Sequence, residues 1–160
     1  MLFADFNDDA RLWIYGFSKP LTASDQKNIR MNMNDFMASW TSHGDKVKGA
    51  YHIIYDRFII IVAENTISGC SIDSSIKVLQ QLDENYNLNG LDFSLVFYRN
   101  KGNVFAVSRR QFQKLVQNGT VDHHTIVYNN TLTTLGQLRA GEWETTFDKS
   151  WHAKTFKKSA

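Results

Sequence analysis

The side chains best suited to chemistry in this 160-residue chain lie in one short run, Ser68 to Ser75. Its sequence is SGCSIDSS, so the only cysteine of the chain, Cys70, lies among hydroxyl groups and one carboxylate, Asp73. The run follows the most apolar stretch, residues 58–63, and precedes a helical pattern at 72–86. A loop that leads from a strand into a helix exposes backbone N–H groups, which can hold an anion or stabilise a thiolate. We therefore take this run as the first candidate site.

A catalytic interpretation of the run needs a base within reach of the thiol. His43 is the candidate base and Asp73 a candidate acceptor to orient its imidazole, so that Cys70 would be the nucleophile of a small hydrolase or transferase. The alternative is that Cys70 is a small, partly buried apolar side chain, as most lone cysteines are. The sequence leaves both interpretations open, because a Cys–His pair is defined by its geometry.

The same run could bind a ligand without reacting with it. Ser68, Ser71 and Ser74 supply hydroxyl groups, and Gly69 lets a phosphate or carboxylate approach the backbone closely. One of these hydroxyl groups, or Asp73, is also expected to cap the helix that follows. The negative charge of Asp73 disfavours an anion, so the chemical nature of the ligand stays open.

Hydrophobic periodicity predicts the elements that position this run. Two amphipathic helices are expected, one that starts at the capping-box-like segment Thr22–Asp25 and one that covers 72–86. Strands are expected at 12–17, 47–55, 58–64 and 91–98. The order strand–helix–strand–strand–helix–strand is that of ferredoxin-like folds, in which an antiparallel sheet has both helices on one face.

The predicted fold class is therefore α+β, with a ferredoxin-like βαββαβ core and a C-terminal strand–helix–strand extension. The chain length is that of one domain. We divide this domain into an arm at 1–9, the ferredoxin-like core at 10–100 and an extension at 101–160 packed on the core.

The extension has its own local signals. A strand is predicted at 104–107, a short helix after its capping residue Ser108, and a second strand at 125–128. Trp143 and Trp151 lie in an otherwise polar tail. Two large aromatic side chains there indicate that the tail lies on the body of the protein.

The alternating strand directions would bring four separate stretches to one end of the predicted sheet. These are Arg11 before the first strand, the end of the first helix at 40–44, the 68–75 run, and Arg99 after the fourth strand. Trp40, Arg11 and Arg99 become ligand-binding candidates because of this predicted position. Their ordinary roles would be a core side chain for Trp40 and solvated charges for the two arginines.

Charge and composition argue against several classes of partner. The 18 basic residues are scattered and the net charge is only +2, so we expect no nucleic-acid partner. The longest near-apolar segment, 53–63, is interrupted by Asp56 and Arg57 and is too short to span a bilayer, so we expect no membrane insertion. The acidic start of the chain does not look like a signal peptide, and one cysteine fits a reducing compartment. We expect a cytoplasmic protein.

Motifs for metals and cofactors are missing from the sequence. There is no cysteine pair, no HExxH and no EF-hand loop. The adjacent His123 and His124 would point to opposite faces of a strand and would chelate poorly. GxxxxGK[ST], GxSxG and GxGxxG are absent as well. We therefore expect no metal site and no cofactor.

Five stretches carry a resemblance to a known family: WIY at 13–15, WTSHG at 40–44, RFI at 57–59, SGCSIDSS at 68–75 and SW at 150–151. Over nearly its whole length the chain resembles a family of short, uncharacterised bacterial proteins, and SGCSIDSS is the most specific shared stretch. Members sometimes carry the label ABC transporter ATPase, but the P-loop that such an ATPase requires does not occur here. The resemblance implies a bacterial cytoplasmic protein and implies no particular activity.

Two functional hypotheses follow from the sequence. The first is a non-catalytic binding or interaction module, whose site for a small molecule or a protein partner is formed by the 40–44 and 68–75 loops. A homodimer through an open face or edge of the sheet is compatible with it, by analogy with other ferredoxin-like sheets. The second is a thiol-dependent hydrolase or transferase that uses Cys70 with His43. A structural or regulatory accessory protein is a third possibility.

Overall fold

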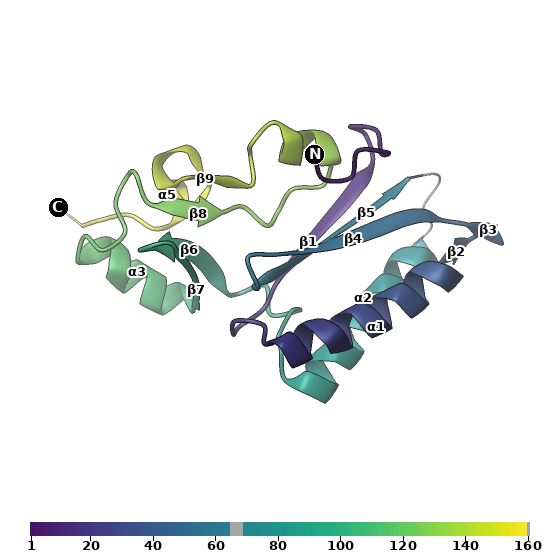
Figure 1. Ribbon diagram of the computed structural model, residues 1–160. Helices are drawn as coiled ribbons and strands as arrows, with labels where there is room; N and C mark the ends of the chain where they lie inside the picture. The colour runs from purple at the N-terminus through teal and green to yellow at the C-terminus, as the bar shows by residue number, and fades with distance from the viewer. Residues whose placement is uncertain (65–68, 160) are drawn as a thin grey trace.

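The computed structural model describes residues 1–64 and 69–159, and for residues 69–71 the backbone alone. Within these residues the chain is a mixed α+β protein with three antiparallel sheets and five α-helices (Figure 1). The two larger sheets lie side by side, one packed on the long helices α1 and α2 and the other on the shorter helix α3.

The first sheet contains three strands in the order β1 (Arg11–Gly16), β5 (Phe58–Glu64) and β4 (Lys48–Ile54). The helices α1 (Ala23–Ser39) and α2 (Gly69–Tyr86) cover one of its faces. The predicted start of α1 is confirmed. Thr22 Oγ1 accepts a hydrogen bond from the Asp25 N–H, and the Asp25 carboxylate accepts one from the Thr22 N–H, both at 3.0 Å.

Two tight hairpins close the ends of β4. At one end β2 (Thr41–Ser42) and β3 (Asp45–Lys46) are joined by His43 and Gly44, which have φ of 53° and 84°. The first helix was predicted to end at 40–44, but α1 ends at Ser39, and the left-handed Gly44 belongs to this hairpin. At the other end Tyr55 and Asp56, also left-handed, turn the chain from β4 into β5.

The second sheet has the order β7 (Asn103–Val107), β6 (Val96–Asn100), β8 (Ile126–Tyr128) and β9 (Glu144–Thr146). The helix α3 (Arg109–Gln117) begins with a capping box at Ser108, so the predicted strand–helix–strand extension is confirmed. Three short helical segments complete the chain: α4 (Leu135–Arg139), the 3-10 helix η1 (Phe147–Lys149) and α5 (His152–Thr155). Trp143 is buried between the two larger sheets, as expected of a tail that lies on the body.

The placement of the fourth predicted strand is wrong. It begins at Val96 and not at residue 91, because residues 92–95 form a turn in which the Asp92 carboxylate accepts the Ser94 N–H at 3.1 Å. It then pairs with β7 and β8 and makes no pair with β1. The first sheet therefore keeps three strands of the predicted core, and the ferredoxin-like arrangement is not confirmed.

Both faces of β1 are covered, as its continuously apolar sequence predicts. Trp13, Tyr15 and Phe17 face the helices. On the other face the second sheet packs so closely that a Cβ atom added to Gly16 would lie 2.3 Å from the Phe97 ring. Glycine is therefore required at this position for the two sheets to meet.

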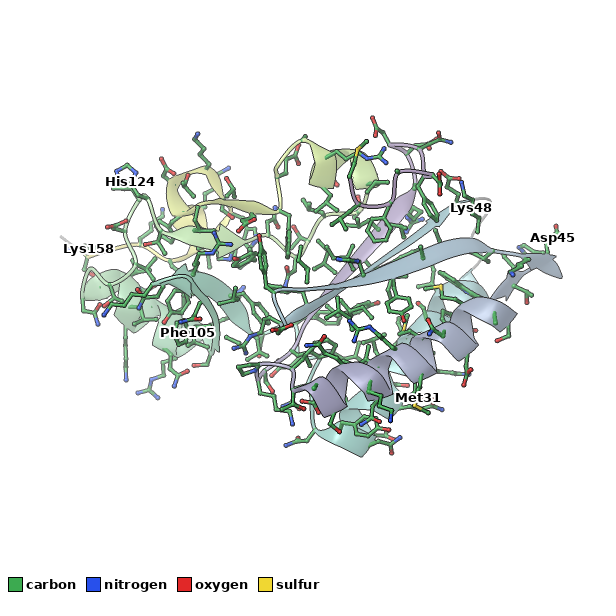
Figure 2. All side chains as sticks on the ribbon, viewed as in Figure 1. Met31, Asp45, Lys48, Phe105, His124 and Lys158 are labelled. Atoms are coloured by element: carbon green, nitrogen blue, oxygen red, sulfur yellow. The ribbon has the colours of Figure 1, made fainter. Side chains whose placement is uncertain are left out.

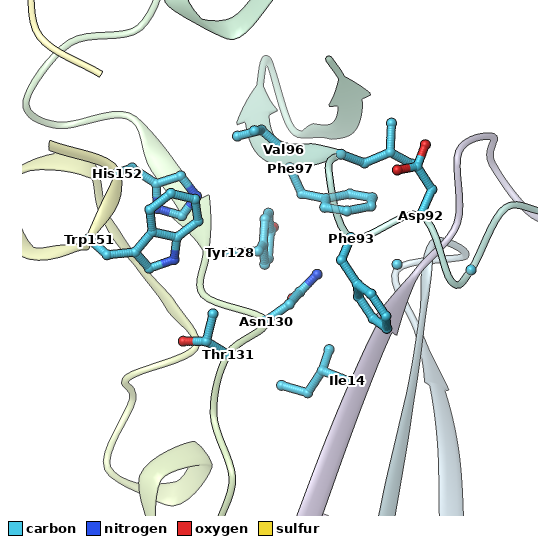
Figure 3. A pocket seen from close by; sticks show the side chains of 13 residues that line it. Ile14, Asp92, Phe93, Val96, Phe97, Tyr128, Asn130, Thr131, Trp151 and His152 are labelled. Carbon is cyan, nitrogen blue, oxygen red and sulfur yellow. The ribbon is translucent and has the colours of Figure 1, made fainter. Parts of the chain in front are cut away.

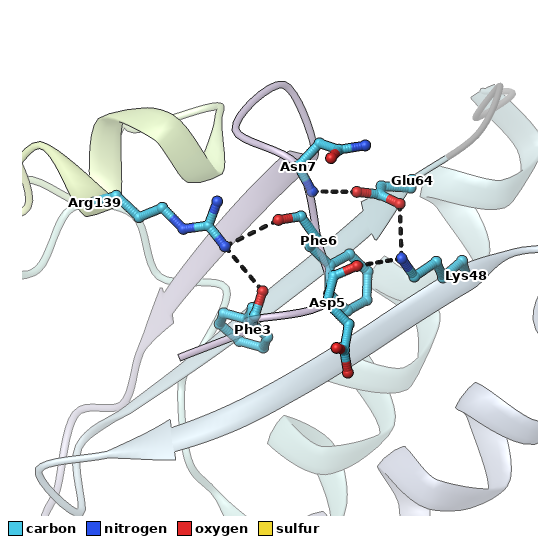
Figure 4. A network of polar contacts seen from close by, with 7 residues as sticks. All are labelled: Phe3, Asp5, Phe6, Asn7, Lys48, Glu64 and Arg139. Atoms are coloured by element: carbon cyan, nitrogen blue, oxygen red, sulfur yellow. Dashed lines mark hydrogen bonds and ion pairs between the residues drawn. The ribbon is translucent and has the colours of Figure 1, made fainter. Parts of the chain in front are cut away.

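The N-terminal arm lies on the surface and is held by polar contacts (Figure 4). Glu64 accepts hydrogen bonds from the Asn7 N–H and from Lys48, which also donates to the Asp5 carbonyl. Arg139 of α4 donates to the Phe3 and Phe6 carbonyls at 3.0 and 2.9 Å. The arm is thus tied to β4, β5 and α4, close to where β1 begins.

Candidate functional site

Part of the predicted site does gather at one end of the first sheet. His43 is exposed at the tip of the β2–β3 hairpin, and β2 lies against α2. Arg11 is exposed opposite Ala63, near the end of β5, and stacks over the Trp13 ring. We call His43, Arg11 and the first two turns of α2 the sheet-end site.

The SGCSIDSS run belongs mostly to a helix and not to a loop. The backbone is helical from Gly69 onward, so Ser75, expected at the end of a loop, lies in the second turn of α2 and donates a hydrogen bond to the Ile72 carbonyl at 2.7 Å. Asp73 and Ser74 are exposed on this helix. Ser68 and the side chains of Cys70 and Ser71 lie outside the described residues, and Gly69 is described only as backbone. The Cys70–His43 pair and the binding of an anion by this run stay predictions.

Trp40 lies in the hydrophobic core. Its side chain is 2% exposed and packs 4.9 Å from the Phe36 ring and 6.3 Å from the Trp13 ring, measured between centroids. The ring also fills the space beside Gly49, where a Cβ atom would lie 2.9 Å from it. The structure therefore supports the core role of Trp40 that the sequence left open beside a ligand-stacking role.

The predicted position of Arg99 at this end of the sheet is wrong. Arg99 lies on β6, where it makes an ion pair with Glu144, donates to the Tyr128 hydroxyl at 2.9 Å and stacks over Tyr55. Tyr55 belongs to the turn before β5, whereas the sheet-end site lies beyond the other end of this strand. In Figure 2 Asp45 of β3 lies beyond the sheet-end side of the first sheet, and Phe105 of β7, the strand that pairs with β6, lies on the opposite side of that sheet. Arg99 lies away from the predicted site because β6 belongs to the second sheet.

A second candidate site, not predicted from the sequence, is a pocket between the two larger sheets (Figure 3). Its volume is about 100 Å³, and residues 90–97 form the wall near β1. The side chains that matter for its chemistry come from four separate segments. We call this site the junction pocket and define it by Ile14, Gly16, Phe93, Asn130, Trp151 and His152.

The outer edge of β1 opens into the junction pocket. Antiparallel pairing turns the polar groups of alternate residues toward β5 and away from it. The Leu12 N–H points away from β5, because it donates to the Thr133 carbonyl at 3.0 Å, and the Ser18 N–H donates to the Leu88 carbonyl at 2.9 Å. Ile14 and Gly16 are the alternate residues between Leu12 and Ser18, so their backbone N–H and C=O groups must also point away from β5. Among the described residues no hydrogen bond to these groups is found.

Two further N–H donors belong to the pocket wall. The Asn130 Oδ1 accepts a hydrogen bond from Trp143 Nε1 at 2.9 Å, which leaves the amide nitrogen on the pocket side in Figure 3. Trp151 Nε1 is buried and has no hydrogen-bond partner in the described part of the chain. Phe93, which is 74% exposed, forms the rim and lies 6.1 Å from the Tyr15 ring.

His152 gives the pocket a neutral wall. The side chain is 1% exposed, its Nδ1 lies 2.6 Å from Ser150 Oγ, and the Trp151 ring stacks on it at 3.9 Å. Burial, and to a smaller extent the nearby charge of Arg109, lowers the pKa of His152 to about 4. The imidazole is therefore uncharged at pH 7, and no lysine or arginine lines the pocket as described.

A wider hollow of about 460 Å³ lies between α3 and the C-terminal segment, next to Phe147 and Phe156. It is open and mostly apolar, with His123, Lys157 and Lys158 at its border. None of its described residues carries a buried polar atom without a partner, in contrast to Trp151. It has volume but little to orient a ligand, so the junction pocket is the better-defined site.

Sequence reasoning missed the junction pocket because its residues are far apart in the chain. Asn130, Trp151 and His152 had no spacing that suggested a common site. The one usable signal was the pair of tryptophans in a polar tail, which indicated burial but not the surface against which they lie. The free edge of β1 could not be foreseen while a fourth strand was expected beside it.

Comparison with known proteins adds no relative: no family model, no curated protein and no solved structure matches the chain. The geometry alone limits what the sites can hold. In the described parts of the chain no helix is long and apolar enough to cross a membrane. Nor do three or more His, Cys, Asp or Glu side chains gather there in an arrangement that could hold a metal ion.

Proposed function

We propose that this protein is a non-catalytic binding module that holds a compact, uncharged ligand in the junction pocket. The observation that supports this best is the buried Trp151 indole N–H, which has no partner among the described residues. Buried polar groups nearly always have a hydrogen-bond partner, and an orphan donor beside a cavity is explained by a ligand that supplies an acceptor.

The composition of the pocket wall supports a neutral ligand. Apolar and aromatic side chains form most of the wall, and Asn130 adds a second donor on the pocket side. Apolar walls with a few convergent polar groups are typical of small-molecule sites. The neutral imidazole of His152 and the carboxylate of Asp92 at the rim both disfavour an anion.

Benzamide is a suitable probe for this function, because its carbonyl is an acceptor that can enter the pocket, while its ring, which is too large for the enclosed volume of about 100 Å³, can stay outside against Phe93 at the rim. We expect saturable shifts of the Trp151 indole and Asn130 side-chain resonances in ¹H–¹⁵N NMR spectra during titration. The Trp151→Phe variant assigns the indole signal. If neither resonance responds to benzamide at tens of millimolar, while the protein stays folded, the binding function of this pocket is contradicted.

Phe93→Ala and Phe105→Ala form a matched pair of variants. Both phenylalanines are exposed, at 74% and 41%, but only Phe93 borders the pocket. Loss of an aromatic contact of about 1 kcal/mol should weaken benzamide binding roughly fivefold in Phe93→Ala. Phe105→Ala should bind benzamide like the unmodified protein, and equal weakening by both variants would point to a non-specific effect.

A thiol-dependent enzyme is the second candidate, and it is favoured by the contact between β2 and α2. That contact puts the exposed His43 hairpin next to the helix whose first turn contains Cys70 in its backbone. A helix N-terminus stabilises a thiolate, and a histidine could then serve as base.

Alkylation by iodoacetamide tests this candidate, since the reagent reports on a single cysteine. A thiolate prepared for catalysis would react with a midpoint well below pH 8.5, and His43→Gln would move that midpoint upward. A midpoint at or above pH 8.5 in the unmodified protein would remove the enzyme hypothesis. The binding function of the junction pocket would not be affected by this result.

Further proposals rest on the sequence, namely a cytoplasmic location, membership of the bacterial family that carries SGCSIDSS, and a homodimer. Helices and the second sheet cover the two faces of the first sheet, so a dimer would use the outer edge of β4. Light scattering after size exclusion measures the mass directly, and a monomer at high protein concentration would contradict the dimer.

A further inference from the structure

We propose that the junction pocket binds an extended peptide segment of about three residues, which adds to the free edge of β1 through Ile14 and Gly16. This inference rests on the proposed binding function and names the chemical class of its ligand. Strand addition of this kind takes its affinity from main-chain hydrogen bonds and its selectivity from pockets for alternate side chains.

The edge of β1 supplies the complementary groups. Each outward-facing residue of an antiparallel edge offers one N–H and one C=O, so Ile14 and Gly16 offer two donors and two acceptors. An amide is the simplest group that can both accept a hydrogen bond from these N–H groups and donate one to these carbonyls. A purely apolar ligand would leave all four groups unpaired, and an anion would leave the two carbonyls without a donor.

The length of the segment follows from the residues that flank the gap. Leu12 is already paired with Thr133, and Ser18 with Leu88. Leu12 and Ser18 are six residue steps apart, which is roughly 20 Å at about 3.3 Å per step, and each flanking contact occupies part of that length. A long strand of a partner protein or of a second copy would collide with Thr133 or Leu88, whereas about three residues fit.

The volume of the pocket fits one side chain of such a segment. About 100 Å³ is less than the roughly 150 Å³ of an engineered cavity that holds benzene, so the enclosed space suits a small aliphatic side chain. The donors of Asn130 and Trp151 lie across the pocket from β1, where they would meet a carbonyl of the segment. Phe93 would then cover the segment at the rim.

Hydrogen exchange tests the free edge without any ligand. The amides of Ile14 and Gly16 should exchange with deuterated water at least about tenfold faster than those of Trp13 and Tyr15, which point to β5 on the same strand. Equal protection of the two sets would show that the edge is already paired, and it would overturn this inference.

Two probes with the same chain of atoms, which differ only in methyl groups on the two amide nitrogens, then test the ligand class. N-acetyl-L-alanine methylamide has two amide N–H groups, and the analogue with both nitrogens methylated has none. We expect the first probe to shift the Ile14 and Gly16 amide signals and to bind at least about tenfold more tightly, because two hydrogen bonds of about 1 kcal/mol each are lost in the second.

The outcomes separate this inference from the function on which it rests. Equal affinity of the two probes, or binding without shifts at Ile14 and Gly16, would overturn the peptide assignment and leave a pocket for other compact ligands. Failure of both probes together with failure of benzamide would contradict the binding function itself. Tighter binding of the unmethylated probe, with shifts at both edge residues, supports the two together.

Discussion

The sheet-end site and the junction pocket differ in how their residues are brought together. The sheet-end site was predicted from a compact motif; the structure places Arg11 opposite Ala63, near the end of β5, and β2 against α2. The junction pocket was predicted by nothing local, yet it has the buried Trp151 indole N–H, which has no partner among the described residues, and an edge of β1 with no hydrogen bond found there.

The two regions also differ in their packing. The hairpin tip at His43 and Gly44 is exposed, and a Cβ atom added to Gly44 would meet nothing within 4 Å. The junction is crowded. Gly16 lies against the Phe97 ring, and the Phe58 ring packs against the rings of Tyr128 and Trp143. We therefore expect changes at the junction to alter stability strongly and changes at the sheet end to alter it weakly.

The largest expected effect is a pH dependence that comes from the junction. Because the folded pKa of His152 is about 4, below the ordinary 6.5, the unfolded chain takes up this proton first as the pH falls. The stabilisation of the folded protein by the neutral His152 is complete above about pH 6.5, and it is lost as the pH drops to about 4. It amounts to about 3 kcal/mol in the free energy of unfolding.

Urea unfolding between pH 7 and pH 4 measures this loss. His152→Gln is the comparison, since the uncharged amide does not titrate there and can still meet Ser150. For each protein the free energy of unfolding is plotted against pH. The difference between the two slopes reports on His152 alone, even if the variant is less stable at every pH. Parallel curves would mean that the imidazole is not held neutral by burial.

A smaller effect is expected from a pair of glycine variants. Gly16→Ala puts a methyl group against the Phe97 ring and should lower the free energy of unfolding by about 2 kcal/mol. The methyl group of Gly44→Ala meets no neighbour. This variant should lower the free energy of unfolding by only about 1 kcal/mol, because the backbone at this position is left-handed, with φ of 84°. Chemical denaturation of both variants checks the order, and a reversed order would contradict the contrast in packing.

The smallest effect is expected at His43. His43→Asn keeps a residue that tolerates the left-handed conformation at an exposed position. The free energy of unfolding should therefore change by less than about 0.5 kcal/mol. Thermal unfolding measures this directly. A loss of more than about 1 kcal/mol would show that the imidazole makes a stabilising contact, and the sheet end would then resemble the junction more than we infer.

The sequence predicted well wherever local chemistry decides the structure. The capping box at Thr22, the capping residue Ser108, the strands β4 and β5 and the strand–helix–strand extension all follow from short-range hydrogen bonding and side-chain period. The burial of Trp143 follows from its size, since a large aromatic side chain in a polar tail finds a covering surface.

Only the tertiary structure decided which sheet the strand at Val96 would join. Its sequence fits a place beside β1 or a place beside β7, because a buried strand of Val, Phe and Tyr packs well in either sheet. The turn at 92–95 and the pairing of β1 with Thr133 settled the choice. That one choice moved Arg99 away from the predicted site and left Ile14 and Gly16 with free polar groups. The apolar pattern of a sequence fixes which face of a strand is buried, but the pairing of its edge depends on segments more than a hundred residues away.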